Sequence, residues 1–204
     1  MLSYLDPIIF PNHCEILEIV PSQRFVFPIF KNGSSSLYKT YNNLVPQDKI
    51  ANLTEVDVFV RDPYARFLSG VQTYIDNLVA ADPAIDRYTV LQFINEYMFL
   101  NKHCVPQFHW LANLARFSSA KIKLLPLTEL TTITHLNSNK HIVDADIVKL
   151  LDNPKIQFYV GIDKVLTETL IGQTVTFREI LNNVNPILYK EVIEYSKNIC
   201  SVLD

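Results

Sequence analysis

The chain has 204 residues, of which 49% are hydrophobic and 11% aromatic, and its formal net charge is −3. This composition excludes a disordered protein, and the length suffices to bury a sizeable core in a single domain over residues 1–204. No stretch reaches the roughly 18 consecutive apolar residues of a membrane-spanning helix. The slight acidic balance gives no electrostatic reason to expect binding to nucleic acid.

The cysteines indicate a reducing environment. Cys14, Cys104 and Cys200 are odd in number and far apart, which predicts free thiols rather than a disulfide framework or a zinc site. The first residues lack the basic start and apolar stretch of a secretory signal peptide. We therefore expect a cytoplasmic protein without a metal site.

Strands and helices alternate along the chain. Runs of β-branched and aromatic residues without strict alternation are typical of strands buried on both faces of a parallel sheet. These runs are 24–30, 56–60, 121–127 and 156–160. Helical patterns cover 34–43, 63–80, 89–100, 107–117, 144–152, 164–171 and 186–203. The order predicts an α/β fold, a parallel β-sheet flanked by helices, with ligands at the carboxyl ends of the strands. The apolar face of the last helix also suits a homodimer contact.

The segment after the first strand has the composition of an anion-binding loop. It reads KNGSSS over residues 31–36 and leads into a helix. The free N–H groups and the dipole of a helix start favour an anion, and Gly33 lets the backbone approach it closely. Lys31 adds a mobile cation, and hydroxyl groups follow on Ser34, Ser35 and Ser36. A serine-rich helix cap after a tight turn is the alternative.

Two familiar phosphate-binding patterns are absent. In the Walker A loop a glycine precedes the lysine, whereas here Lys31 precedes Gly33. The four glycines of the chain are also too far apart for the dinucleotide-binding fingerprint.

A second motif ends the next strand, in the segment VFVRDPYARFLSG over residues 58–70. Asp62 and Pro63 suit the N-cap and first position of a helix, and Ser69 follows about two turns later. Arg61 at the strand end can bind a phosphate through two hydrogen bonds. An i,i+4 pair with Asp62 accounts for Arg66.

Together the two motifs resemble the sulfotransferases that use 3′-phosphoadenosine 5′-phosphosulfate (PAPS). KNGSSSL resembles the loop that holds the 5′-phosphosulfate in that family, and RDPYARFLS the segment whose Arg and Ser hold the 3′-phosphate. The resemblance implies a P-loop-containing nucleotide hydrolase-like sulfotransferase fold. It assigns the 5′-phosphosulfate to Lys31, Asn32, Gly33, Ser34, Ser35 and Ser36, and the 3′-phosphate to Arg61 and Ser69. Lys31 would also stabilise the bridging oxygen that leaves.

Two further segments are similar to the carbohydrate (Golgi-type) branch of this family. NKHCVPQFHWL, residues 101–111, resembles its H-W-x-P-Q segment, with Cys104 in place of Trp. FYVGIDKVLTETL, residues 158–170, resembles its late F-[IV]-G-x-x-E stretch, with Asp163 or Lys164 in place of the acid. The glycine-rich adenine-binding segment of the cytosolic enzymes is missing, and Ser36 stands where they carry Trp. Both departures favour the carbohydrate branch.

The resemblance implies an enzyme that transfers a sulfonyl group from PAPS to a hydroxyl or amine. The acceptor would be a saccharide or another small molecule, the second product would be adenosine 3′,5′-bisphosphate, and no metal is required. His103 is the candidate general base, and His109 is the weaker one. A kinase-like nucleotide-dependent phosphotransferase and a non-catalytic module that binds PAPS or the bisphosphate remain as alternatives.

Overall fold

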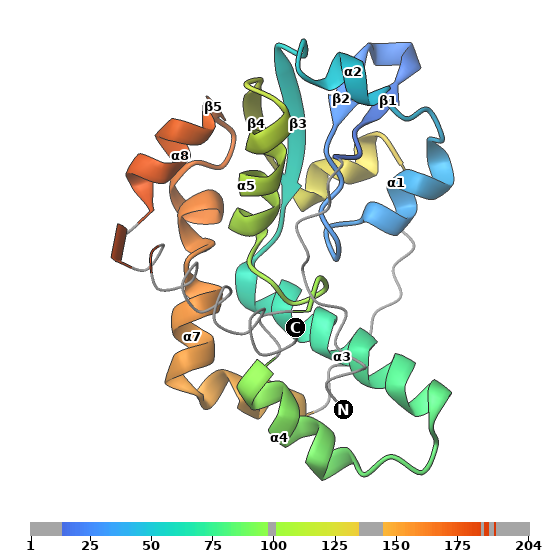
Figure 1. The fold of residues 1–204 in the computed structure, drawn as a ribbon, viewed down its shortest axis with the longest axis vertical. Helices are drawn as coiled ribbons and strands as arrows, with labels where there is room; N and C mark the ends of the chain where they lie inside the picture. Colours follow the sequence, from blue (N-terminus) through green and yellow to red (C-terminus); the bar gives the residue numbers. More distant parts are fainter. Residues whose placement is uncertain (1–13, 98–100, 135–144, 185, 188–189, 191–204) are drawn as a thin grey trace.

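The computed structural model describes residues 14–97, 101–134, 145–184, 186–187 and 190 (Figure 1). Five strands form one sheet in the order β1 (Leu17–Ile19), β2 (Arg24–Val26), β3 (Glu55–Val60), β4 (Lys121–Pro126) and β5 (Thr174–Val175). The three central strands are parallel, whereas β1 and β5 pair with their neighbours in antiparallel orientation. The predicted α/β fold with flanking helices is therefore confirmed, but the sheet is mixed rather than wholly parallel.

Strand β3 is the centre of the sheet. It pairs with β4 over six residues, from Glu55 opposite Lys121 to Val60 opposite Pro126. Val56, Val58 and Val60 pack into the larger apolar core, and Phe59 belongs to a second apolar cluster. Burial on both faces explains why this strand reads as an almost continuous apolar run.

Two predicted helices match the structure closely. They are α3 (Pro63–Ala81) and α5 (Gln107–Phe117). Asp62 caps α3 as predicted, because its Oδ1 accepts a hydrogen bond from the Ala65 N–H at 2.7 Å and Pro63 occupies the first helical position.

The remaining helices are no longer than α5. They are α1 (Ser34–Thr40), α2 (Gln47–Ile50), α4 (Arg87–Tyr97), α6 (Ala145–Val148), α7 (Pro154–Gly161) and α8 (Phe177–Asn183). Short 3₁₀ turns cover Val20–Ser22, Leu127–Thr132 and Lys149–Asp152, and a π-helical turn covers Val165–Thr169. The expected helix over 186–203 lies almost wholly outside the described residues, as do the last three residues of the one expected over 89–100.

The strand predicted over 156–160 is wrong, because these residues belong to α7. Asn153 caps the helix by accepting a hydrogen bond from the Lys155 N–H at 2.8 Å, and Pro154 takes the first position. Ile156, Tyr159 and Val160 are buried at helical spacing, so the apolar run is one face of a helix. The strand expected over 24–30 is also shorter, because only Arg24–Val26 pairs in the sheet.

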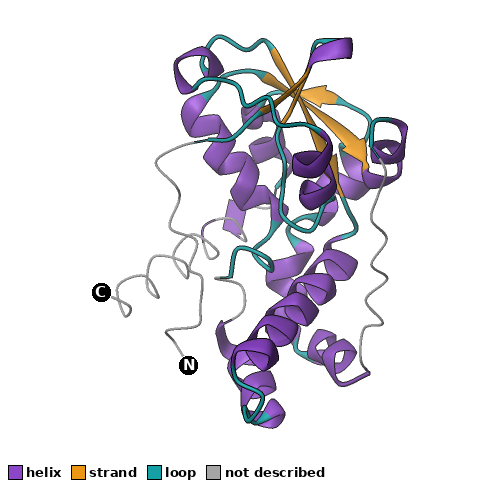
Figure 2. Cartoon of the chain, turned by 90° about the vertical axis from the view of Figure 1, so that its right-hand side faces the viewer, coloured by secondary structure: helices purple, strands orange, loops and turns teal. Residues whose placement is uncertain are grey.

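The helices lie on the faces of the sheet and beyond one of its ends. Figure 1 shows α5 beside β3 and β4, and α3, α4 and α7 grouped beyond the point where β3 ends. Figure 2 shows the same division, with the strands at one end of the molecule and the longest helix at the other. None of the described helices is long and apolar enough to cross a bilayer.

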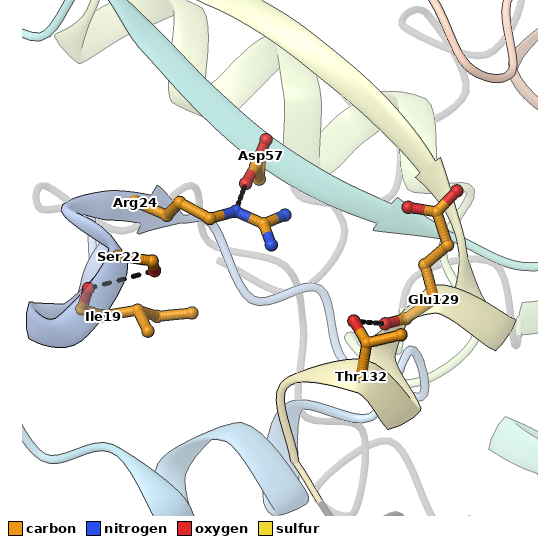
Figure 3. Close-up of polar contacts among 6 residues, drawn as sticks. All are labelled: Ile19, Ser22, Arg24, Asp57, Glu129 and Thr132. Atoms are coloured by element: carbon orange, nitrogen blue, oxygen red, sulfur yellow. Dashed lines mark hydrogen bonds and ion pairs between the residues drawn. The ribbon is translucent and has the colours of Figure 1, made fainter.

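One buried carboxylate lies within the sheet rather than at its end. Asp57 interrupts the apolar run of β3, and its Oδ2 lies 2.6 Å from Nε of Arg24 on β2 (Figure 3). This pair joins two neighbouring strands, so Asp57 has a structural role and is not left for ligand chemistry.

Candidate functional site

The loop after β2 reverses the chain through two left-handed residues. Lys31 has φ of 69° and Gly33 has φ of 78°. Glycine adopts this conformation without cost, but a lysine there is strained, and such strain concentrates at functional sites. Gly33 is the N-cap of α1, and its carbonyl accepts hydrogen bonds from the N–H groups of Ser36 and Leu37, each at 3.0 Å.

The Lys31 side chain crosses from this loop to α3. Its Nζ donates a hydrogen bond to Thr73 Oγ1 at 2.6 Å, and that hydroxyl donates to the carbonyl of Ser69 at 3.1 Å. The ammonium group is therefore held one helical turn from Ser69. Burial, and then the positive charge of Arg61, lower the pKa of Lys31.

Arg61 meets the same loop from the end of β3. Its Nη1 donates to the main-chain oxygen of Lys31 at 3.3 Å, and the residue is half-buried. Burial lowers the pKa of Arg61. Within the described part of the chain no ion pair neutralises Lys31 or Arg61. Two half-buried cations, one from the loop after β2 and one from the end of β3, thus lie close together with no ion pair to either among the described residues.

The loop residues divide into buried and exposed ones. The Ser34 and Ser36 side chains are buried, and Ser35 is exposed at the start of α1. Asn32 is buried, and its N–H donates to the carbonyl of Ile29 at 3.0 Å. The donors of Asn32 are therefore used inside the protein, unlike those of a ligand contact.

The amide of Asn32 bonds to two neighbouring segments. Its Nδ2 donates to the carbonyl of Phe59 at 2.8 Å and to Gln107 Oε1 at 2.5 Å. Gln107, the first residue of α5, also bonds to Arg61, since Oε1 accepts from the Arg61 N–H at 3.0 Å and Nε2 donates to its carbonyl at 2.9 Å. Gln107 lies in the segment over residues 101–111, but the sequence predicted no role for it.

Arg66 is fully buried and does not form the predicted pair with Asp62. Its Nε donates to the carbonyl of Phe30 at 3.1 Å, and its Nη1 donates to the carbonyl of Val105. Burial lowers the pKa of Arg66 to about 10, and Asp163 is the main opposing charge. The side chain links the segment before the loop to the segment before α5.

His103 lies beside the loop. Its ring packs on that of Phe30, the residue before Lys31, with centroids 5.3 Å apart. Its carbonyl approaches Gly70 so closely that a Cβ on that glycine would lie 2.3 Å away. The segment over residues 101–111 therefore lies next to the loop after β2 and to helix α3. A general base would have to lie there.

His109 is fully buried, in contrast to the half-buried His103. Both of its ring nitrogens lack a hydrogen-bond partner in the described part of the protein, and burial lowers its pKa to about 4. A base must reach its substrate, so the geometry favours His103 over His109.

Asp163 holds the start of α5. Its two carboxylate oxygens accept the N–H groups of Gln107 and Phe108, at 2.5 and 2.9 Å. Burial raises the pKa of this carboxyl to about 6, although the charge of Arg66 opposes the shift. In the segment over residues 158–170, the expected acidic position is therefore taken by the buried Asp163 and not by Lys164.

The chain matches no protein-family model, no curated protein and no solved structure. Across the described ranges, no group of three or more His, Cys, Asp or Glu side chains is arranged to hold a metal ion.

Proposed function

We propose that the protein is a PAPS-dependent sulfotransferase of the carbohydrate-type branch, with the P-loop-like sulfotransferase fold. One observation carries the proposal: the Arg61 guanidinium, at the end of β3, bonds to the Lys31 carbonyl at 3.3 Å in the loop after the adjacent parallel strand β2, and neither cation forms an ion pair with the residues described. Half-buried cations that repel one another are stabilised by a dianionic ligand. PAPS carries two such groups, one at each end of its ribose.

The residues around these cations fit the two anionic ends. Lys31 and the start of α1 from Gly33 to Ser35 would hold the 5′-phosphosulfate, and Arg61 with Ser69 would hold the 3′-phosphate. Ser36 is buried and its N–H already bonds to the Gly33 carbonyl, so it would support the loop. The hydrogen-bonded chain that runs from Lys31 through Thr73 to the main-chain carbonyl of the buried Ser69 supports this assignment, because it joins residues of the two sets. Asn32 would support the loop through its hydrogen bonds to Phe59 and Gln107 and would not contact the ligand.

Transfer breaks the bond between sulfur and the 5′-phosphate oxygen and forms a bond from sulfur to the acceptor oxygen or nitrogen. The Lys31 ammonium would stabilise the charge that develops on the leaving oxygen, which is the largest contribution expected of such a site. His103, next to Phe30, would take the proton of the acceptor. The acceptor is a saccharide or another small hydroxylated or amino compound.

Calorimetric titration with adenosine 3′,5′-bisphosphate, ADP and ATP, without added metal, tests the donor site. We expect a clear preference for the bisphosphate that Arg61→Ala abolishes and Arg178→Ala, an exposed arginine on α8, leaves intact. Stronger binding of ATP that requires Mg²⁺ would contradict the proposal and favour the phosphotransferase. Bisphosphate binding without any turnover of PAPS would favour the non-catalytic module.

A further inference from the structure

We propose that Gln107 is a positioning residue that holds the two halves of the donor site at a fixed separation. The inference rests on the proposed function and deepens it, because it assigns a role to a residue that touches neither end of the donor. It concerns the relative placement of the loop after β2 and the end of β3.

The Gln107 amide bonds to both halves at once. On one side Oε1 accepts from Asn32 Nδ2 at 2.5 Å, next to Lys31 in the chain. On the other side the same amide bonds both the N–H and the carbonyl of Arg61, at 3.0 and 2.9 Å. Arg61 is thus held through its main chain, which leaves its guanidinium directed to the loop.

Asp163 in turn fixes Gln107. The carboxylate accepts the Gln107 N–H at 2.5 Å and the Phe108 N–H at 2.9 Å, so the first turn of α5 cannot shift without breaking both bonds. An acidic group at a helix start is also favoured by the helix dipole. Gln107, Asn32 and Asp163 are at most 1% exposed. Loss of one member of such a buried network leaves the others unsatisfied.

A fixed separation matters only to a ligand that spans both halves. A ligand with two anionic ends must order both halves relative to each other, and a preformed arrangement removes that cost. A ligand with one phosphate needs only one half in place. Removal of the Gln107 amide should therefore weaken binding of the bisphosphate far more than binding of either mononucleotide.

The test compares adenosine 3′,5′-bisphosphate with 5′-AMP and 3′-AMP, each titrated into the whole chain and followed by ligand-observed NMR and calorimetry. Gln107→Met keeps the length of the side chain and removes its hydrogen bonds. We expect it to weaken the bisphosphate by about 10–100-fold and each mononucleotide by less than about threefold. Asp163→Asn, which loses one of two acceptors, should act in the same direction and less strongly.

Asn113→Ala is the matched control, since it removes another buried amide of α5 whose described hydrogen bond is with Arg116. It should leave the ratio of the three affinities unchanged. If Gln107→Met does not fold, Asp163→Asn carries the test, because it leaves the Gln107 amide in place and weakens only the bonds that hold the first turn of α5. An equal loss of affinity for all three ligands, or no loss for any, would overturn the role of Gln107 and leave the proposed function standing. A wild-type protein that does not prefer the bisphosphate would overturn the proposed function as well.

Discussion

Lys31 Nζ lies 2.6 Å from Thr73 Oγ1, a hydrogen bond between residues 42 positions apart that joins the loop after β2 to helix α3. Thr73 in turn donates a hydrogen bond to the carbonyl of Ser69. The main-chain carbonyl of Lys31 also accepts a hydrogen bond from the Arg61 guanidinium. The side chain is therefore held in the site before any ligand binds. Such preorganised charge is what electrostatic catalysis requires.

Replacement of Lys31 by alanine should affect turnover more than binding. The main-chain N–H groups of the loop remain, so the affinity for the bisphosphate should fall by less than about tenfold. The leaving oxygen loses its cation, so turnover of PAPS should fall by about 100- to 1,000-fold. Single-turnover release of the bisphosphate from labelled PAPS measures this, with Lys39→Ala, on the exposed side of α1, as the control. Unchanged turnover would contradict the assigned role of Lys31.

The positive φ of Lys31 makes a separate prediction about stability. At φ of 69° alanine keeps the steric penalty of a side chain, whereas glycine has none. Lys31→Gly should therefore be more stable than Lys31→Ala by about 1 kcal/mol. Urea denaturation of the two variants gives the difference, and both should show the same loss of turnover. An alanine variant that is as stable as the glycine variant would argue against a left-handed Lys31.

Gly70 is expected to tolerate no side chain. A Cβ there would lie 2.3 Å from the His103 carbonyl oxygen and 2.8 Å from Cys104 Sγ, so Gly70→Ala must push the segment with His103 away from α3. Overpacking of this kind costs about 1–3 kcal/mol, and turnover should fall as His103 moves. Gly161→Ala is the matched control, since its nearest neighbour would be Tyr64 Oη at 3.5 Å, an ordinary contact. Thermal unfolding and PAPS turnover should be measured for both variants. Equal melting temperatures and equal turnover would contradict the close approach of the His103 carbonyl to Gly70.

The sequence predicted what depends on local signals. Asp62 and Pro63 marked the start of α3, and the apolar spacing of 107–117 marked α5. The apolar run 156–160 misled because β-branched and aromatic residues suit a buried strand and a buried helix face equally well. The capping residues Asn153 and Pro154 were the better signal there. Strands β1 and β5, of three and two residues, have too few side chains to show a pattern.

The parts of the site that the sequence left without a role depend on long-range placement. Gln107 meets Asn32 across 75 residues and Asp163 across 56, and no local pattern specifies such contacts. Arg66 suggested a surface pair because its spacing from Asp62 allows one, yet helix α3 turns that face into the core. A buried arginine is favourable only where other segments supply carbonyl groups that accept its hydrogen bonds. The carbonyls of Phe30 and Val105 do so here.

Two buried groups near Arg66 should give opposite pH dependences of stability. His109 ordinarily titrates near 6.5, but burial lowers its pKa to about 4 in the folded protein. The folded state therefore loses stability as the pH falls from 6.5 to 4, because only the unfolded chain binds the proton. Asp163 has its pKa raised by burial from 3.8 to about 6, so the folded state binds a proton first and gains stability as the pH falls from 6 to 4.

In the wild-type protein the two effects should nearly cancel, and single variants should separate them. Asp163→Asn removes the gain, so its free energy of unfolding should fall by on the order of 2 kcal/mol more than that of the wild type between pH 6.5 and 4. His109→Leu removes the loss, so its free energy of unfolding should instead rise over the same range relative to the wild type. Urea denaturation of the three proteins at pH 7, 6, 5 and 4 measures the slopes. Slopes of the same sign in both variants, relative to the wild type, would mean that one of the two groups is not buried as the structure has it.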